Sequence, residues 1–221
     1  MEFLTVTNII VGVTCLISYL AFSDPKLKMA LIFHPYKIKR ERALSGFFTS
    51  GLIHADFMHL AFNMFTLYSF GNVIEQYFKI LFPGYGVYVY IALYILGLLF
   101  SHMPVYAKQQ DNPGYFALGA SGAVSAVLFA SVLLDPWSYL YIMAVLPCPQ
   151  IVAAIGFVWY SSYMDKHGND NIGHSAHLFG AVFGFLFTGA MQPALFVNFF
   201  ECAISFNTNC IYDYIMQLRG Q

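Results

Sequence analysis

The chain has 221 residues, of which 59% are hydrophobic and 10% charged, and its net charge is −1. A soluble domain carries about 45–50% apolar and about 25% charged residues, so too few polar side chains are present here to cover the apolar ones. A nucleic-acid-binding protein needs a basic face, which ten scattered Lys and Arg residues do not provide. These figures exclude both classes and leave an all-α polytopic membrane protein.

Six apolar segments are each long enough to cross a bilayer as a helix, which takes about 20 residues. The first is expected to be a retained helix and not a signal peptide, because no Lys or Arg precedes it. The fifth is expected to begin near Pro149, since proline fits a first helical turn and damages a helix interior. The segment before it, 137–146, is expected to lie at the membrane interface. The predicted spans of this single domain, 1–221, are 3–22, 57–78, 84–104, 116–134, 149–164 and 172–191.

The segments between the predicted spans differ in charge. An interfacial loop over 24–56 holds six of the ten basic residues. With six spans, the loops after the first, third and fifth share one side of the membrane and hold eight of the ten. The positive-inside tendency would place that side in the cytoplasm. The tail, 192–221, is mixed, and 195–206 could form a further membrane-associated helix. Cys202 and Cys210 in this tail are expected to be free thiols, because four cysteines in so apolar a chain do not suggest a disulfide framework.

Polar side chains inside a membrane span are costly, so each is a candidate site residue. His59 and Asn63 lie in the first two turns of the second span, Ser121 in those of the fourth and His177 in those of the sixth. These three spans begin on the same side of the membrane, so the four side chains can meet at one depth. His59 and Asn63 are four residues apart and therefore share one helix face.

The residue types at these positions suit nucleophilic catalysis. A serine hydroxyl becomes a good nucleophile when a neighbouring base accepts its proton, and imidazole is such a base near neutral pH. Ser121 and His177 would form a dyad, because the fourth and sixth spans contain no Asp or Glu. The side chains of His59 and Asn63 and the N–H of Ser121 could stabilise the oxyanion of a tetrahedral intermediate.

Small residues predict a close contact between the fourth and sixth spans. Gly119 and Gly122 flank Ser121, and Gly180 and Gly184 form a small-residue face just after His177. Such faces let two helix backbones approach closely in lipid. The contact would bring the His177 ring to the Ser121 hydroxyl.

Three other polar residues are assigned roles outside the chemistry. His54 lies in the first loop and is expected to be structural. Glu75 lies near the far end of the second span and is expected to hydrogen-bond within the bundle or to reach the interface. His174 is expected to be solvated or to cap the sixth helix.

The same residues resemble the motifs of the rhomboid family. Residues 54–64 are similar to the rhomboid H-x4-H-x3-N signature of the second transmembrane helix, and 119–122 to the rhomboid G-x-S-G. Residues 176–184 resemble the A-H-x-x-G-x-x-x-G of the sixth helix, and 71–75 the glycine-to-glutamate end of the second. The motifs follow one another in the family's order.

Rhomboids are intramembrane serine proteases with a six-helix bundle. The resemblance implies that Ser121 is the nucleophile, that His177 is the base, and that His59, Asn63 and the Ser121 N–H bind the oxyanion. It implies substrates that are transmembrane segments of other membrane proteins, cut near the outer face after a small residue, with no metal or cofactor. It also implies a cytoplasmic N-terminus, against the charge distribution, and we follow the family here. The expected location is the bacterial inner membrane.

Three positions depart from the family pattern. Ser45 and Gly46 stand where many members carry Trp-Arg in the first loop, which puts the usual anchoring of that loop in question. Ser125 stands where some members place an aromatic residue stacked on the catalytic histidine, so another group must orient His177.

Two other functions are compatible with parts of this pattern. In a haem-binding membrane protein, His59 and His177 would be axial ligands, but Ser121 and Asn63 would have no role. In a rhomboid-like binding protein without catalysis, the serine or the histidine would be expected to be missing, and both are present.

Overall fold

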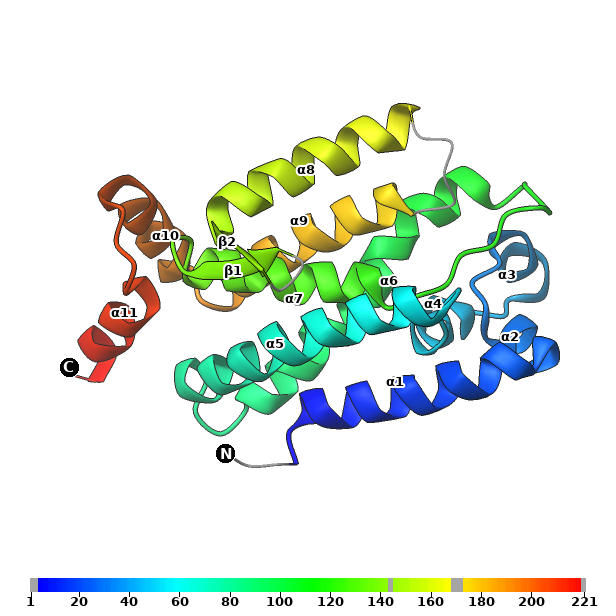
Figure 1. Ribbon diagram of the computed structural model, residues 1–221, viewed down its shortest axis with the longest axis horizontal. Helices are drawn as coiled ribbons and strands as arrows, with labels where there is room; N and C mark the ends of the chain where they lie inside the picture. The colour runs from blue at the N-terminus through cyan, green and yellow to red at the C-terminus, as the bar shows by residue number, and fades with distance from the viewer. Residues whose placement is uncertain (1–3, 143–144, 168–172, 220–221) are drawn as a thin grey trace.

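The computed structural model describes residues 4–142, 145–167 and 173–219. Most of this part of the chain is helical, and the longest helices lie side by side (Figure 1). These helices are α1 (Val6–Ser23), α5 (Phe57–Leu81), α6 (Gly86–Gln109), α7 (Ser121–Leu134), α8 (Gln150–His167) and α9 (His174–Met191).

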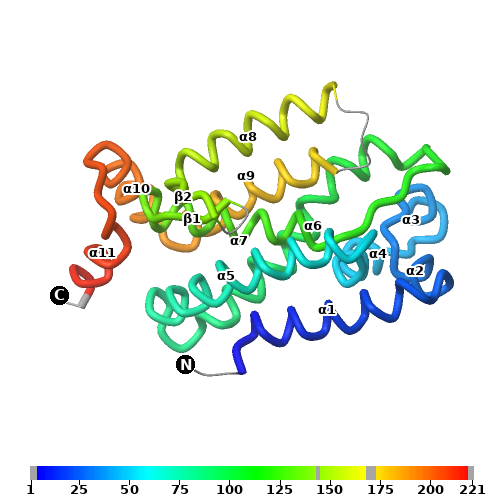
Figure 2. The backbone as a smooth tube through the Cα atoms, in the orientation of Figure 1, coloured from blue at the N-terminus to red at the C-terminus, as the bar shows by residue number. Residues whose placement is uncertain are grey.

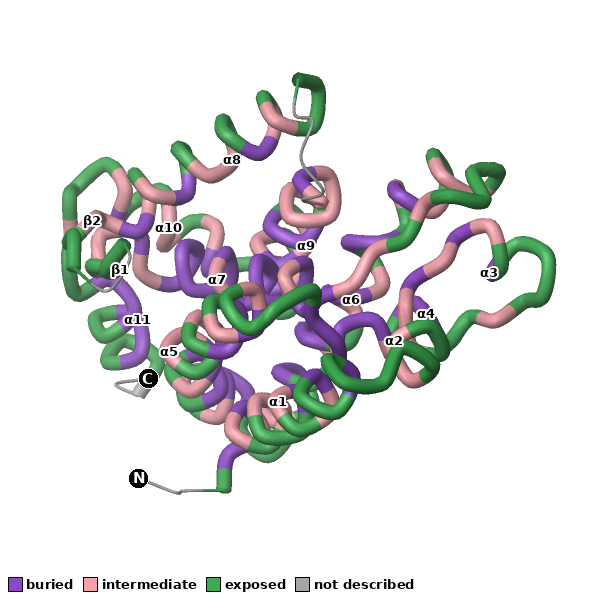
Figure 3. The backbone as a smooth tube through the Cα atoms, turned by 45° about the vertical axis from the view of Figure 1, so that its right-hand side comes forward, coloured by how far each residue is buried: buried purple, intermediate pink, exposed green. Residues whose placement is uncertain are grey.

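The central helix of the bundle is α7, which contacts α5, α6, α8 and α9. Its sequence contains no charged residue and is rich in Ala, Val, Ser and Leu, and most of its length is buried (Figure 3). Two helices lie at opposite edges of the bundle in Figure 2, where α1 packs on α5 and α8 packs on α9. The core is therefore built around the helix that begins with Ser121.

The closest helix contact joins α7 and α9, and glycine makes it possible. A Cβ atom at Gly180 would overlap the carbonyl oxygen of Gly122, and one at Gly184 would overlap that of Ala126. Close approach through small residues is a common way for helices to associate in lipid. It fixes the start of α9 against the start of α7.

Only some of these helices have the length and composition of a membrane span. Among the described residues, α1 and α6 do, and α9 together with α10 (Ala194–Ser205) is a third candidate that bends by 115° at its break. The apolar helix α7 is shorter, at 14 residues. The count of six crossings therefore stays a prediction.

The fourth predicted span differs most from the structure. Its helix begins at Ser121 and not at Phe116. The chain around Ala117 is extended, because Phe33 and Ala117 form an antiparallel bridge with two backbone hydrogen bonds of 3.0 Å. The expected start of the sixth span, residue 172, lies outside the described residues.

The predicted interfacial loop contains short helices. Proline occupies the first turn of both α2 (Pro25–Leu31) and α3 (Pro35–Glu41), and Asp24 caps α2 by accepting two backbone N–H groups. A single turn, α4 (Gly46–Thr49), and the 3-10 helix η1 (Ser50–Leu52) follow.

Apolar packing anchors this loop where the family's Trp-Arg is absent. Phe33, Ile38 and Phe47 form a buried cluster with Val105 of α6. Gly46 lies in the same place, and a Cβ atom there would approach the Ile32 carbonyl oxygen to 3.2 Å. The loop is thus held against the bundle by apolar packing, without the Trp-Arg pair of the family.

The segment expected at the interface before the fifth helix forms a hairpin. Strand β1 (Tyr139–Ile142) pairs with β2 (Leu146–Pro149) in antiparallel register, with Tyr139 opposite Pro149. Tyr and Ile favour strands, and proline is tolerated here because both strands are edges. The hairpin lies beside the end of α7 in Figure 1.

The expectation of free thiols in the tail is wrong. Cys202 of α10 and Cys210 of α11 (Cys210–Arg219) are joined by a disulfide, with their Cα atoms 5.8 Å apart. Helix α10 ends at Ser205, and the left-handed conformation of the next residue, Phe206, turns the chain back on itself. This reversal brings the two cysteines within the Cα separation that a disulfide needs.

Candidate active site

The backbone before Ser121 is held in place from several directions. Gly119 has a φ of 113°, in the region that favours glycine, and donates its N–H to the Ser50 carbonyl at 2.9 Å. The next N–H, of Ala120, donates to Nε2 of His54 at 3.3 Å. The turn into α7 therefore presents Ser121 from a backbone fixed by the first loop.

The Ser121 hydroxyl and the His177 ring are in direct contact. The distance between Ser121 Oγ and His177 Nε2 is 2.7 Å, a short hydrogen bond. One residue begins α7 and the other lies in the first turn of α9, the two helices that glycine brings together. This is the geometry in which an imidazole can take a proton from a serine.

The aromatic partner of His177 comes from α8. The Phe157 ring lies 6.2 Å from the His177 ring, with 28° between their planes, and the His174 ring meets His177 edge-on at 6.1 Å. Ser125, at the family's aromatic position, is buried in α7. The fifth predicted span contains no motif that singles out Phe157, so the sequence analysis missed it.

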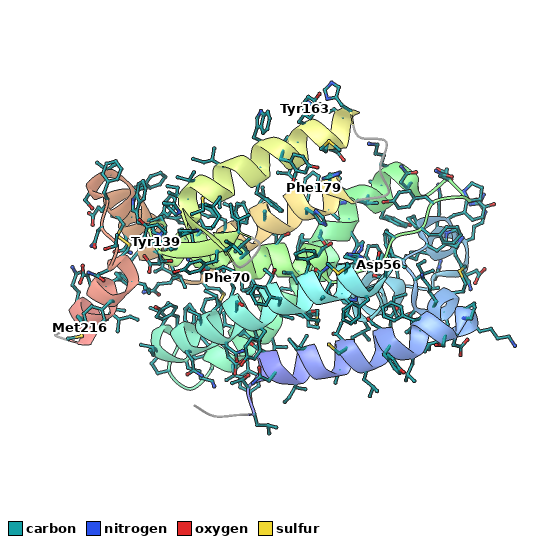
Figure 4. The ribbon with its side chains drawn as sticks, in the orientation of Figure 1. Asp56, Phe70, Tyr139, Tyr163, Phe179 and Met216 are labelled. Carbon is teal, nitrogen blue, oxygen red and sulfur yellow. A yellow bond between two sulfur atoms is a disulfide. The ribbon has the colours of Figure 1, made fainter. Side chains whose placement is uncertain are left out.

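His59 lies against the turn that precedes Ser121. A Cβ atom at Gly119 would fall 2.7 Å from Cε1 of His59, so the ring and the turn are in contact. Asp56, labelled in Figure 4, caps α5 by accepting the His59 backbone N–H at 2.8 Å. The predicted site residue on α5 is thus placed beside the G-x-S-G segment.

Asn63 lies one turn further along the same face of α5. It is 7% exposed, and its Nδ2 donates to the His59 carbonyl at 2.9 Å. An amide group carries two N–H donors, so one remains for another acceptor. In the part of the chain that the structure describes, no hydrogen bond joins Ser121 directly to His59 or Asn63.

His54 connects α1 to the turn before Ser121. The Ser18 hydroxyl donates to the Leu52 carbonyl at 2.9 Å and lies 3.0 Å from Nδ1 of His54. Nδ1 therefore carries the proton, which leaves Nε2 to accept the Ala120 N–H. Burial lowers the pKa of His54 to about 3, with a further lowering from His59 and an opposing effect of Asp56. The ring is therefore neutral near pH 7 and serves as a fixed acceptor.

Glu75 lies in the bundle and caps α1. Its carboxylate accepts the Thr7 N–H at 2.9 Å, the Thr7 hydroxyl at 3.0 Å and the Val6 N–H at 3.2 Å, and Lys79 lies 3.2 Å away. A carboxylate at a helix N-terminus satisfies free N–H groups and favours the helix dipole. These contacts of Glu75 are structural, and none of them involves Ser121.

His174 differs from its expected solvated position. It is 5% exposed and begins α9, where its ring meets Tyr160 edge-on at 5.6 Å. Packing of α8 against α9 covers it, a contact that no local pattern in the sequence reveals. Within the described residues, no group of three or more His, Cys, Asp and Glu side chains is arranged to hold a metal ion.

Comparison with known proteins yields two matches. The sequence pattern of the Rhomboid domain matches residues 41–193, a range that contains Ser121, His177, His59 and Asn63. The chain is also 33% identical over 144 residues to RHOMBOID-like protein 12, mitochondrial, of Arabidopsis thaliana. That similarity covers 60% of this chain and 42% of the plant protein, so this chain corresponds to less than half of its relative.

Proposed function

The chain belongs to the rhomboid family, and we propose that it is an intramembrane serine protease that cleaves transmembrane segments of other membrane proteins. The observation that carries this proposal is the 2.7 Å hydrogen bond between Ser121 Oγ and His177 Nε2. The two residues come from helices that are fixed together by glycine, so the pair is preorganised.

In the proposed reaction, His177 Nε2 takes the proton from Ser121 as Oγ attacks the carbonyl carbon of the scissile peptide bond. The tetrahedral intermediate then collapses, the C–N bond breaks, and His177 gives its proton to the leaving amine. Water, deprotonated by His177, hydrolyses the acyl-enzyme ester and restores the Ser121 hydroxyl. The Phe157 ring beside His177 limits its motion during these proton transfers.

The oxyanion of each tetrahedral intermediate needs hydrogen-bond donors. The backbone N–H of Ser121, the second amide N–H of Asn63 and the ring of His59 are the proposed donors. The positions of His59 and Asn63 support this assignment. His59 contacts Gly119, and Asn63 lies one turn further along the same face of α5. His54 has a positioning role, because it holds the Ala120 N–H.

The protein is an integral membrane protein, as its rhomboid domain and apolar helices indicate. Six crossings, with α1, α5, α6, α7, α8 and α9 as the spans, are part of the proposal, as is access of water from the side of α2 and α3. The relative is a mitochondrial protein, so the comparison gives no support to the expected bacterial inner membrane. The proposal therefore names no particular membrane.

The decisive experiment is labelling of the purified protein with a fluorophosphonate probe, combined with cleavage of a reporter transmembrane substrate. Wild type should be labelled and should cleave, and Ser121→Ala should do neither. Ser125→Ala is the matched control, because it removes a buried serine hydroxyl one turn further along α7. If wild type is folded but neither reacts nor cleaves, the binding protein without catalysis replaces the protease. A visible absorption band from bound haem would favour the haem-binding membrane protein.

A further inference from the structure

A groove runs along α5 from Met58 toward the other end of the bundle, and its described lining residues do not include Ser121, His177, His59 or Asn63. It consists of two cavities, of about 430 Å³ and about 350 Å³, which share Phe65 and Phe70 of α5 and Leu140 and Tyr141 of β1. Along α5 the lining begins at Met58, next to His59, and ends at Tyr77. Figure 4 labels Phe70 and Tyr139, which mark the α5 and hairpin sides of the second cavity.

The two cavities differ in chemistry. The one that begins at Met58 has an apolar lining of Phe, Met, Leu, Ile and Ala, with Thr66 and Tyr141 as its residues that carry a hydroxyl group. The one at the far end includes Ser131, Asp135 and Gln150. The groove is thus mostly apolar at its Met58 end and becomes polar and acidic at its other end.

The acidic end has acceptors without donors. Among the described residues, Oδ1 of Asp135 and Oε1 of Gln150 are buried and accept no hydrogen bond. Gln150 is 4% exposed, and its amide nitrogen is already bound to the Ser138 hydroxyl. Burial raises the pKa of Asp135 to about 6, so the carboxyl group is mostly ionised at pH 7. Unsatisfied buried acceptors are costly, and an incoming group with N–H donors and positive charge would relieve the cost.

A transmembrane segment that lies along α5 would bring such a group. Membrane proteins carry Lys and Arg at the ends of their spans, and these side chains reach out of the hydrocarbon region. We propose that the pocket containing Asp135 and Gln150 binds a Lys or Arg that follows the transmembrane segment of the substrate. This inference rests on the proposed function and adds a requirement on the substrate sequence.

The fold sets the distance between the cleavage point and this cation. Helix α7 begins with Ser121, has 14 residues and is followed directly by Asp135. At 1.5 Å per residue the two ends are about 21 Å apart. A wholly helical substrate spans that length with about 14 residues, and with about 10 if the residues next to the scissile bond are extended. The preferred cation therefore lies about 10–14 residues after the cleavage point.

The volumes fit side chains and not a whole helix. Cavities of about 430 Å³ and about 350 Å³ hold a few side chains from one face of a substrate helix that rests on α5. Phe62 and Phe65, which line the cavities, are themselves exposed, and Tyr68 of α5 is an exposed residue outside their lining. A lipid with an ammonium head group is another occupant of suitable charge, but lipid binding would not make cleavage depend on the position of a Lys in the substrate.

The first test changes only the substrate, so it does not depend on the folding of an enzyme variant. A reporter segment carries a single Lys at 6, 10, 12, 14 or 20 residues after the cleavage point, or Gln at each position as the control. The wild-type enzyme in phosphatidylcholine vesicles should cleave the 10–14 set with kcat/KM about tenfold above the Gln controls, the effect of one charge-assisted hydrogen bond. A Lys placed 6 or 20 residues after the cleavage point should give no increase in kcat/KM over the Gln control.

The second test reverses the charges. Asp135→Lys should prefer a reporter with Glu at the same position over one with Lys, and Asp135→Asn should have no preference. Asp111→Asn is the matched control, because Asp111 is an exposed carboxylate paired with Lys39 near the other end of the bundle. Fluorophosphonate labelling of each variant shows that Ser121 is still reactive.

The outcomes separate this inference from the protease proposal. Equal cleavage of Lys and Gln reporters at every position by a labelled enzyme overturns the inference and leaves the protease intact. Retention of the Lys preference by Asp135→Asn also overturns it. A wild-type enzyme that cleaves no reporter and is not labelled removes the proposed function and this inference together.

Discussion

The two ends of α7 are built in opposite ways. At the first end, Ser121 is hydrogen-bonded to His177, and the N–H groups of Gly119 and Ala120 both have acceptors. At the other end, Asp135 and Gln150 each keep a buried oxygen that accepts no hydrogen bond within the described chain. One end therefore has the proposed catalytic groups already paired, and the other has buried acceptors that an external donor would satisfy.

This difference separates chemistry from recognition. A catalytic pair gains from preorganisation, because its geometry is needed at the moment of reaction. A binding pocket gains from acceptors that only its ligand satisfies, since the free state is then the less favourable one. Four changes to the first end follow, from the largest expected effect to the smallest, and the charge-reversal tests address the second end.

The largest effect is expected from filling the α7–α9 contact. Gly180→Val places side-chain atoms where the Gly122 carbonyl lies, so the two helices must separate and the bond between Ser121 and His177 must break. Fluorophosphonate labelling should disappear and the midpoint of thermal unfolding should fall. Gly156→Ala on α8 is the control, because no atom lies within 4 Å of its added Cβ. A Gly180→Val protein with normal labelling would show that the close contact is not needed.

A smaller but still large loss is expected when one of the proposed oxyanion donors is removed. Asn63→Ala should lower kcat by about 10²–10³, since the other two donors remain. Single-turnover cleavage of the reporter measures this directly. Labelling should slow in parallel, because the probe also forms a tetrahedral centre at Ser121. An unchanged kcat in a folded sample would remove Asn63 from the site.

A moderate loss is expected at the aromatic partner of the histidine. Phe157→Leu keeps an apolar side chain but removes the ring that lies 6.2 Å from His177, so the imidazole can leave its productive orientation. A ring contact contributes about 0.5–1.5 kcal/mol, so kcat should fall by about threefold to tenfold. Phe157→Tyr should restore it. Equal rates for the Leu and Tyr variants would show that the ring does not position His177.

The sequence predicts the contact between Ser121 and His177 better than it predicts the contacts around them. Ser121 and His177 can be paired from their depth in apolar spans and from the small residues beside them, because both signals are local and periodic. Phe157 and Ser18 reach the site across helices that are distant in the sequence, and no periodic pattern records such contacts.

The same limit explains the two local errors. The start of α7 at Ser121 depends on pairing between residues 33 and 117, which shortens an otherwise apolar helix. The disulfide between Cys202 and Cys210 depends on the chain reversal at Phe206, a backbone conformation that composition does not reveal.

The smallest effect is expected in the pH dependence of stability. Burial holds the pKa of His54 at about 3 in the folded protein, against about 6.5 in an unfolded chain. Between these values the unfolded state binds a proton that the folded state does not, so this group's contribution to stability falls as the pH drops from about 6.5 toward 3.

His54→Gln retains an acceptor for the Ala120 N–H and has no titrating group. The midpoint of thermal unfolding should drop by a few degrees more in wild type than in His54→Gln between pH 7 and pH 5. His167→Gln, which changes an exposed histidine on α8, is the control and should follow wild type. Parallel curves for wild type and His54→Gln would mean that His54 is protonated in the folded protein, and Nε2 could then no longer accept the N–H that fixes the turn before Ser121.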